Sequence, residues 1–206
     1  MTQLARLLLL AVLPAVASQS LKNEDLGVNV ISKPGLFASH VSDFSKMDLA
    51  NMRAVNLGVY GELEEWQKLK HGRGRTVAFG ADGQVLAGNQ TDVRLESHEM
   101  LDADHQLVVY WWQWVGGSSS QSLIVQVLEL RGDKVFIAQQ IEADAHGAGA
   151  AAAFNPKTRL LTVKAVGFAE NDGHCCPSFL GVVTFRWDGQ RFVRIRARRA
   201  PIPKQD

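Results

Sequence analysis

The stretch formed by residues 107–114 constrains the fold more than any other, because it is apolar on both faces of an expected strand. Successive side chains of a strand point to opposite faces of its sheet. A strand that is apolar on both faces has to be covered on both sides, so we predict that it lies at the centre of the fold. One face would carry Leu107, Val109 and Trp111, and the other Val108, Tyr110, Trp112 and Trp114.

Short strand-like runs separated by tight turns surround this stretch. Asp82-Gly83 and Asp188-Gly189 each stand between two apolar runs, which is a strong local signal for a β-hairpin. Similar runs at 123–130 and 135–141 are divided by a turn that contains Gly132. The pattern predicts a mainly β (α+β) fold, in which an antiparallel meander forms a curved sheet or a sandwich.

One or two helices are expected in the N-terminal part, packed on the sheet. Ser42 is placed to cap a short one. Residues 62–70 predict an amphipathic helix, because their apolar side chains recur at three-residue spacing and Gly72 can end it. Trp66 is expected to anchor this helix on the sheet. The three apolar side chains are those of Leu63, Trp66 and Leu69.

Residues 1–17 have the pattern of a secretory signal peptide. Arg6 is followed by an apolar run at 7–13 and by the small-residue site Ala15-Val16-Ala17. The apolar run is too short to span a bilayer as a helix. We expect cleavage after Ala17, export to the periplasm or the extracellular space, and no membrane span.

The rest of the chain is expected to form one domain. A chain of 206 residues with 46% hydrophobic content can build one well-buried core, which we assign to residues 18–200, followed by a tail at 201–206. Removal of residues 1–17 takes away one positive charge and no acidic residue, so the formal net charge falls from +1 to 0. A neutral protein lacks the basic excess that nucleic-acid binding selects for. We therefore predict no nucleic-acid partner.

The chain has two cysteines, Cys175 and Cys176, and they are adjacent. Across a trans peptide their α-carbons lie about 3.8 Å apart, below the roughly 4.4 Å lower end of ordinary disulfides, so a bond between them distorts the linking peptide. An oxidising compartment nevertheless disfavours thiols. We predict a vicinal disulfide, and the alternatives are two thiols, an intermolecular bridge or a metal site.

Asp172, His174, Cys175 and Cys176 form the best candidate metal cluster, since imidazole and thiolate suit zinc or copper. Structural zinc sites, however, usually take cysteines two to four residues apart. We therefore expect no cofactor and keep a metal as the alternative. A cysteine beside His174 also suits a thiol nucleophile, whereas no serine-hydrolase signature occurs. The sequence predicts no catalytic residue, and a small thiol-dependent enzyme or a redox protein is the alternative.

Tyr110, Trp112 and Trp114 are the candidate ligand-binding residues. Aromatic side chains bury a large area at modest entropic cost, so this group is suited to stack on a sugar or a peptide. Packing in the core is the alternative role of the same rings. We predict a non-catalytic binding or envelope-associated protein, whose partner is an envelope glycan or another protein.

The last expected strand, at 191–198, alternates with period two. A row of arginines on one face protects a sheet edge from pairing with another chain. Attraction to anionic envelope polymers is a further hypothesis for this row. Its members are Arg194, Arg196 and Arg198, and the opposite face carries Val193, Ile195 and Ala197.

The segment His174-Cys175-Cys176-Pro177-Ser178 is followed by an expected strand and by the turn sequence at 186–193. In this order the chain resembles bacterial secreted proteins of the LppP/LprE lipoprotein type, which carry a similar Cys-Cys-Pro-Ser element before a closing hairpin. The resemblance extends upstream through Asp102-Ala103-Asp104 and the loop at 116–118. It implies an envelope compartment and a similar fold, but no established activity. The lipid-accepting cysteine of the lipoprotein members is missing here, so tethering to the membrane is not implied.

Overall fold

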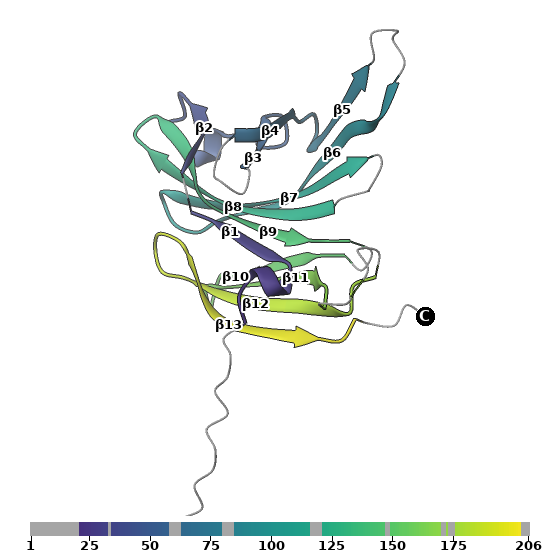
Figure 1. The fold of residues 1–206 in the computed structure, drawn as a ribbon. Helices are drawn as coiled ribbons and strands as arrows, with labels where there is room; N and C mark the ends of the chain where they lie inside the picture. The colour runs from purple at the N-terminus through teal and green to yellow at the C-terminus, as the bar shows by residue number, and fades with distance from the viewer. Residues whose placement is uncertain are drawn as a thin grey trace, which may run out of the picture.

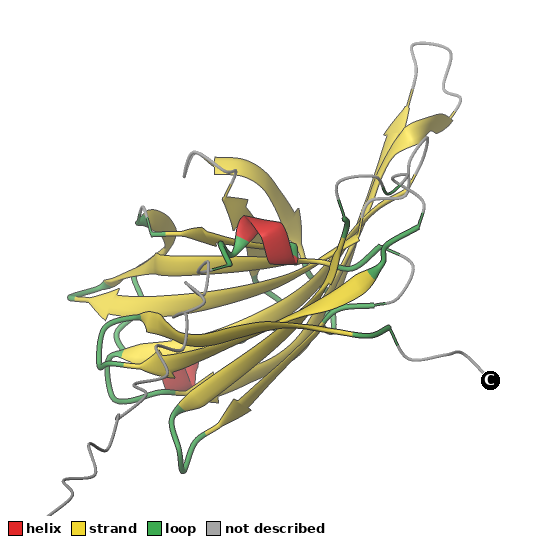
Figure 2. Cartoon of the chain, turned by 60° about the horizontal axis from the view of Figure 1, so that its bottom comes forward, coloured by secondary structure: helices red, strands yellow, loops and turns green. Residues whose placement is uncertain are grey.

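The computed structural model describes residues 21–32, 34–57, 63–79, 85–115, 121–146, 149–169, 172 and 176–202. The expected signal peptide and most of the expected tail lie outside these residues. The described chain is mainly β with antiparallel sheets, which confirms the predicted fold class (Figure 2). The helical segments found in it are two 3-10 turns of three residues each, and neither is long enough to cross a membrane.

A central antiparallel sheet organises the molecule. Its strand order is β1-β9-β8-β7-β6-β5, and β2 pairs with β9 along the same edge as β1. Strands β5 to β9 are neighbours in the order of the sequence, as expected for a meander. The strands are β1 (Val28–Ile31), β2 (Gly35–Ser39), β5 (Arg73–Phe79), β6 (Val85–Met100), β7 (His105–Val115), β8 (Gln121–Arg131) and β9 (Lys134–Asp144).

Two further sheets cover the central sheet, so that the fold has three layers (Figure 1). A four-stranded sheet with the order β10-β11-β12-β13 lies below it in the view of Figure 1, and a two-stranded ribbon of β3 and β4 lies above it. The strands are β10 (Ala151–Asn155), β11 (Leu160–Gly167), β12 (Phe179–Trp187), β13 (Phe192–Ala200), β3 (Arg53–Leu57) and β4 (Leu63–Lys68).

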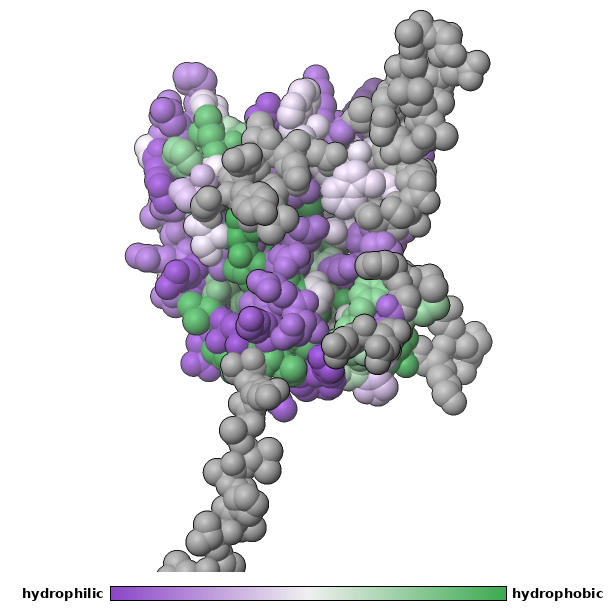
Figure 3. Space-filling view, viewed as in Figure 1, coloured by the Kyte–Doolittle hydropathy of each residue, from purple (hydrophilic) through white to green (hydrophobic). Residues whose placement is uncertain are grey.

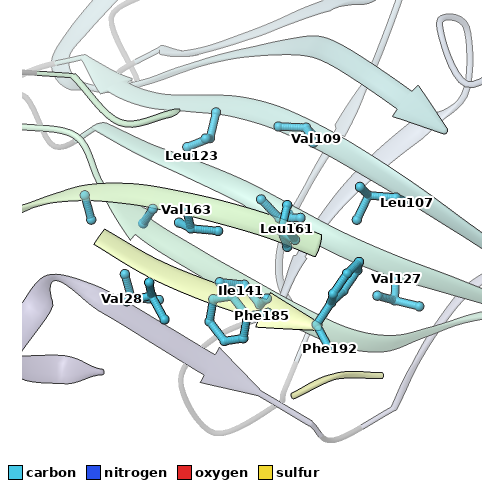
Figure 4. Packing of buried hydrophobic residues seen from close by; sticks show 14 of the residues in the cluster. Val28, Leu107, Val109, Leu123, Val127, Ile141, Leu161, Val163, Phe185 and Phe192 are labelled. Carbon is cyan, nitrogen blue, oxygen red and sulfur yellow. The ribbon is translucent and has the colours of Figure 1, made fainter. Parts of the chain in front are cut away.

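The first core fills the space between the central sheet and the β10–β13 sheet (Figure 4). The 3-10 turn η1 (Glu24–Leu26) closes one side of it, where Leu26 is fully buried. The Leu26 carbonyl lies so close to Gly181 that a Cβ atom at this position would clash with it. Members of this core include Leu107, Val109, Leu123, Leu161, Val163, Phe185 and Phe192.

The second core lies on the opposite face of the central sheet, under the β3–β4 ribbon, β2 and the 3-10 turn η2 (Phe44–Lys46). Val108, Tyr110 and Trp112 are each 0% exposed in this core, whereas their neighbours Leu107 and Val109 belong to the first core. The prediction of a central strand covered on both sides is therefore confirmed. The visible surface in Figure 3 is mainly hydrophilic, with small and separated hydrophobic areas.

The predicted helix at 62–70 is wrong, because Leu63–Lys68 forms strand β4 and pairs with β3. Within this strand Gln67 is buried while its neighbour Trp66 is exposed, so the burial pattern has period two. Pairing with β3 outweighs the weak local preference for a helix. Trp66 is 52% exposed, with the guanidinium of Arg53 5.2 Å from the centre of its ring, and therefore does not anchor the segment on the sheet.

The predicted helix near Ser42 is reduced to η2. Asp43, not Ser42, caps this turn, since its carboxylate accepts a hydrogen bond from the Ser45 N–H at 2.7 Å. Phe44 packs into the second core, and the extended backbone of Met47 ends the turn. One buried ring is therefore enough to hold this segment, and no amphipathic face is formed.

A β-bulge changes the predicted row of arginines on β13. The register pairs Arg196 with Thr184 but Arg194 with Phe185, so that Ile195 has no partner in β12. Cross-strand partners share a face of the sheet, and the successive residues Thr184 and Phe185 point to opposite faces. Arg194 therefore lies on the face of Phe185, which belongs to the first core.

The guanidinium of Arg194 donates to the carbonyl of Leu21 at 2.6 Å and to the side-chain oxygen of Asn23 at 2.9 Å. It thus ties the start of the described chain to the edge of the β10–β13 sheet. The prediction of one face for all three arginines is wrong for Arg194, and holds for Arg196 and Arg198, which are two residues apart beyond the bulge.

A buried polar network joins the β3–β4 ribbon to the central sheet. The Gln140 amide donates to the side-chain oxygen of Asn56 and to the carbonyl of Leu57, both at 2.8 Å, and accepts from the Leu57 N–H at 3.1 Å. Gln126 donates to Gln140 at 2.8 Å and to the carbonyl of Val55 at 2.6 Å. Both glutamines are 0% exposed, so water does not compete for these bonds. The network fixes the ribbon in one position on the sheet.

Replacing Gln140 by leucine is expected to lower the free energy of unfolding by about 2–4 kcal/mol, because buried groups of Asn56 and Leu57 lose their partners. Urea unfolding followed by circular dichroism measures this change. Gln190→Leu, at an exposed turn position, is the control and should change it by less than about 0.5 kcal/mol. If Gln140→Leu were as stable as the wild type, the network would not be what holds the ribbon.

Candidate functional site

A groove of about 340 Å³ lies where the second-core face of the central sheet turns polar. The β3–β4 ribbon reaches as far as Gln140, whose side chain holds Leu57 at the end of β3. Glu142 and Asp144 lie two and four residues farther along β9, beyond this contact. The groove is lined by Asn29 of β1, Trp114 of β7, Gln121 and Ser122 of β8, Glu142 and Asp144 of β9, and His146.

The strand register explains why these side chains meet. Ser122 of β8 lies opposite Trp112 of β7 on one side and opposite Asp144 of β9 on the other. In the next row, Glu142 lies between its partners Ile124 and Asn29. Trp112 and Ile124 belong to the second core, and cross-strand partners share a face. The polar residues therefore continue the second-core face beyond the described part of the β3–β4 ribbon.

Hydrogen bonds hold the acidic groups of the groove in fixed positions. The Ser122 hydroxyl donates to Glu142 at 2.7 Å. The Asp144 carboxylate contacts the His146 ring nitrogen Nδ1 at 2.7 Å and accepts from the His146 backbone N–H at 3.0 Å. The His146 ring in turn meets the ring of Phe168 edge to face, at 6.4 Å between centres. Two carboxylates are thus oriented before any ligand arrives.

The three aromatic residues predicted to bind a ligand have different positions. Tyr110 and Trp112 are 0% exposed, and burial raises the pKa of the Tyr110 hydroxyl above its ordinary value. Neither ring is open to a ligand, because the second core covers this face of β7, and the prediction is wrong for both. Trp114 is half-buried at the wall of the groove, with its ring centre 6.4 Å from that of Trp112. It is the member of the group that can contact a bound molecule.

A second groove, of about 480 Å³, lies on the first-core face of the central sheet, and sequence analysis gave no sign of it. Arg73, Arg75 and Arg94 line it beside the half-buried ring of Trp111. Asp92 holds Arg75 through two bonds of 2.6 and 2.9 Å. The groove carries an excess of positive charge, and its one lining carboxylate, Asp92, is already bonded to Arg75, whereas two carboxylates line the Trp114 groove. We therefore place the candidate site at Trp114.

The segment Asp102-Ala103-Asp104 forms the turn between β6 and β7. Burial raises the pKa of Asp102, but hydrogen bonds from His105 and from the Asp104 N–H, with the charge of His105, outweigh it and lower the pKa overall. The Asp102 carboxylate lies 2.7 Å from the ring nitrogen Nδ1 of His105. The contact between Asp102 and His105 stabilises the turn between β6 and β7, so the Asp102 carboxylate already has a partner within the protein.

The Cys-Cys element is described only in part, because His174 and Cys175 lie outside the described residues. Cys176 is exposed. Asp172 accepts hydrogen bonds from the Ala169 N–H at 2.6 Å and from the Ser178 hydroxyl at 2.5 Å, and so closes the loop before β12. The described part of the chain contains no group of three potential metal ligands. The predicted vicinal disulfide and the predicted metal cluster both stay predictions.

Sequence analysis missed most of the groove residues. The signal is present in β9, where the polar residues Gln140, Glu142 and Asp144 alternate with Ile141 and Ala143. Such alternation indicates one polar face. What it does not indicate is that Asn29, more than a hundred positions earlier, pairs with Glu142 and completes the wall.

No family model, no curated protein and no solved structure matches the chain. The resemblance to the LppP/LprE type therefore stays a prediction. The geometry of the groove is therefore the evidence for a function.

The stability of the loop before β12 is expected to depend on pH, because the Asp172 carboxylate holds this loop through hydrogen bonds. The hydrogen bond from Ser178, followed by that from the Ala169 N–H, holds the pKa of Asp172 below its ordinary value of 3.8. A carboxyl group with a lowered folded-state pKa stabilises the fold above its unfolded pKa and loses this contribution as the pH falls through the folded value. The Ala169 amide should therefore be protected from hydrogen exchange at neutral pH and lose this protection well below pH 3.8.

Amide exchange measured by NMR, expressed as protection factors, follows this change. Asp172→Asn is the matched control, since it keeps the shape but cannot ionise, and its protection should not vary over the same pH range. Identical pH profiles of the two proteins would contradict the assigned role of Asp172.

Proposed function

We propose that the protein is a secreted, non-catalytic binding protein that holds a glycan in the Trp114 groove. The observation that carries this proposal is a half-buried tryptophan beside two carboxylates in fixed positions and the amide side chain of Asn29. Ligand sites combine an apolar or aromatic wall with a few placed polar groups. A sugar ring offers a C–H face that stacks on an aromatic ring, and hydroxyl groups that bond to carboxylates and amides.

The hydrogen bonds of the groove favour binding over catalysis. A nucleophilic site needs a hydroxyl or thiol that is bonded to a general base and that a substrate can reach. Here the Ser122 hydroxyl donates to Glu142, while His146 is paired with Asp144, so the described groove contains no serine–histidine contact. Ser122 is also 7% exposed, which keeps its oxygen from an incoming substrate. The same bonds present carboxylate oxygens as acceptors for ligand hydroxyl groups.

Export is part of this proposal and rests on residues 1–17, whose pattern is that of a signal peptide. A protein outside the cytoplasm meets the glycans of the cell envelope. We therefore propose an envelope glycan as the ligand class.

Replacing Trp114 by alanine is expected to weaken glycan binding about tenfold or more, because the stacking surface is lost. Isothermal titration with peptidoglycan fragments and neutral oligosaccharides measures the affinity. Trp66→Ala is the matched control: this tryptophan lies on β4, is 52% exposed and lines no part of the groove, so its loss should leave binding unchanged.

Glu142→Gln and Asp144→Asn keep the volume of the groove and separate its chemistry from its folding. Each should weaken binding several-fold while circular dichroism stays that of the wild type. Wild-type affinity in Trp114→Ala, or the absence of binding to every glycan offered, would refute the proposed function.

The thiol-dependent alternative is tested at Cys175 and Cys176. The predicted vicinal disulfide requires that the mass of the non-reduced monomer be two hydrogens below the thiol form, and that alkylation occur only after reduction. Ready alkylation of both residues in the native protein, or a stoichiometric metal removed by a chelator, would move the thiol or metal hypothesis ahead. The double variant with serine at both positions should bind glycans like the wild type.

A further inference from the structure

The outer face of the β10–β13 sheet carries a concentration of positive charge. Along β11, β12 and β13, residues that face the first core alternate with residues that do not. The second set therefore points outward, away from the first core. Four outward residues are exposed cations, and we call them the basic face. They are Lys164 of β11, Arg186 of β12, and Arg196 and Arg198 of β13.

The charge of this face is not balanced locally. None of the outward positions that the register aligns between β10 and β13 holds an aspartate or a glutamate. Several arginines elsewhere are paired with carboxylates, such as Arg75 with Asp92 and Arg131 with Glu129. Within the described residues, no ion pair is formed by any member of the basic face. The whole chain has a formal charge of +1, so with four cations here the rest of the chain sums to −3.

Aliphatic side chains lie among these cations. Val182 is the register partner of both Lys164 and Arg198, and it is 7% exposed although it points outward, as expected where long basic side chains lie over it. Val193 and Ile195 on the edge strand are 41% and 48% exposed. The outward positions carry no aromatic ring, so this face lacks the stacking surface of a glycan site.

We propose that the basic face binds the surface of an anionic lipid bilayer. An anionic bilayer presents a plane of negative charge, and a sheet face with unpaired cations complements it. Each lysine or arginine held near such a surface strengthens binding about fivefold. The exposed aliphatic residues of the edge strand are suited to the boundary between headgroups and acyl chains. Binding of this kind is peripheral and needs no membrane span.

This proposal is independent of the proposed glycan site. The Trp114 groove opens on the second-core face of the central sheet, whereas the basic face belongs to the layer on the other side. The β10–β13 sheet and the β3–β4 ribbon lie on opposite sides of the central sheet (Figure 1), so a protein bound through the basic face would direct its groove away from the lipid surface.

Co-sedimentation of the full chain with vesicles tests the proposal. We expect binding to vesicles that contain phosphatidylglycerol, no binding to pure phosphatidylcholine, and loss of binding at high salt, because salt screens exposed charges. A variant with glutamine at all four positions of the basic face should bind several hundred-fold more weakly, at about fivefold per cation. These positions are exposed, so circular dichroism should show an unchanged fold.

The matched control removes the same charge from the central sheet and the layer on its other side, through Lys46→Gln, Arg53→Gln, Lys68→Gln and Lys134→Gln, all at exposed positions. It should keep wild-type binding within a few-fold. Equal losses in both variants would show that only net charge matters and would overturn the assignment. The assignment would also be overturned if the wild type did not bind anionic vesicles, or if it bound soluble dextran sulfate but no vesicles.

Discussion

Burial of both faces of the central strands is the constraint on which the rest of the structure depends. β7 places Leu107 and Val109 in one core and Tyr110 and Trp112 in the other, and each large apolar side chain contributes about 1.5–3 kcal/mol when it is removed from water. An isolated two-stranded ribbon is marginal in water. The β3–β4 ribbon is therefore stable only as the cover of β7 to β9, and the Gln140 network decides where on this face it sits.

How far the sequence predicts the fold depends on whether the signal is local. The alternation at 107–114 requires two covering layers whatever those layers are, and the structure has them. The three-residue spacing of Leu63, Trp66 and Leu69 is equally local, but pairing with β3 overrides it. The bulge at Ile195 cannot be anticipated from β13 alone, since it is defined by the register against β12. One inserted residue is enough to separate Arg194 from Arg196.

The candidate site shows the same limit. Trp114 could be nominated from the sequence, because aromatic residues in a group are conspicuous. Tyr110 and Trp112 lie on the same face of β7 as Trp114, but they are buried in the second core, whereas Trp114 lies at the groove beyond the β3–β4 ribbon. Where the ribbon ends is a tertiary feature. Ser122, Glu142 and Asp144 become a site only through cross-strand register. Polar residues at the end of a buried strand face are thus a better pointer to such a groove than the aromatic group itself.

The pairing of β1 and β2 with β9 has a consequence for the order in which the molecule forms. Val28 pairs with Ala143, and Ser39 with Lys134, so the first two strands of the chain have their partner more than ninety residues later. During synthesis these strands cannot pair until β9 has been made, whereas β6, β7 and β8 can join their neighbours as soon as each appears. Contacts between distant parts of a chain are slow to form because of the entropy of closing the loop. We therefore expect the N-terminal strands to close the central sheet last, and Asn29 to complete the groove only at that step.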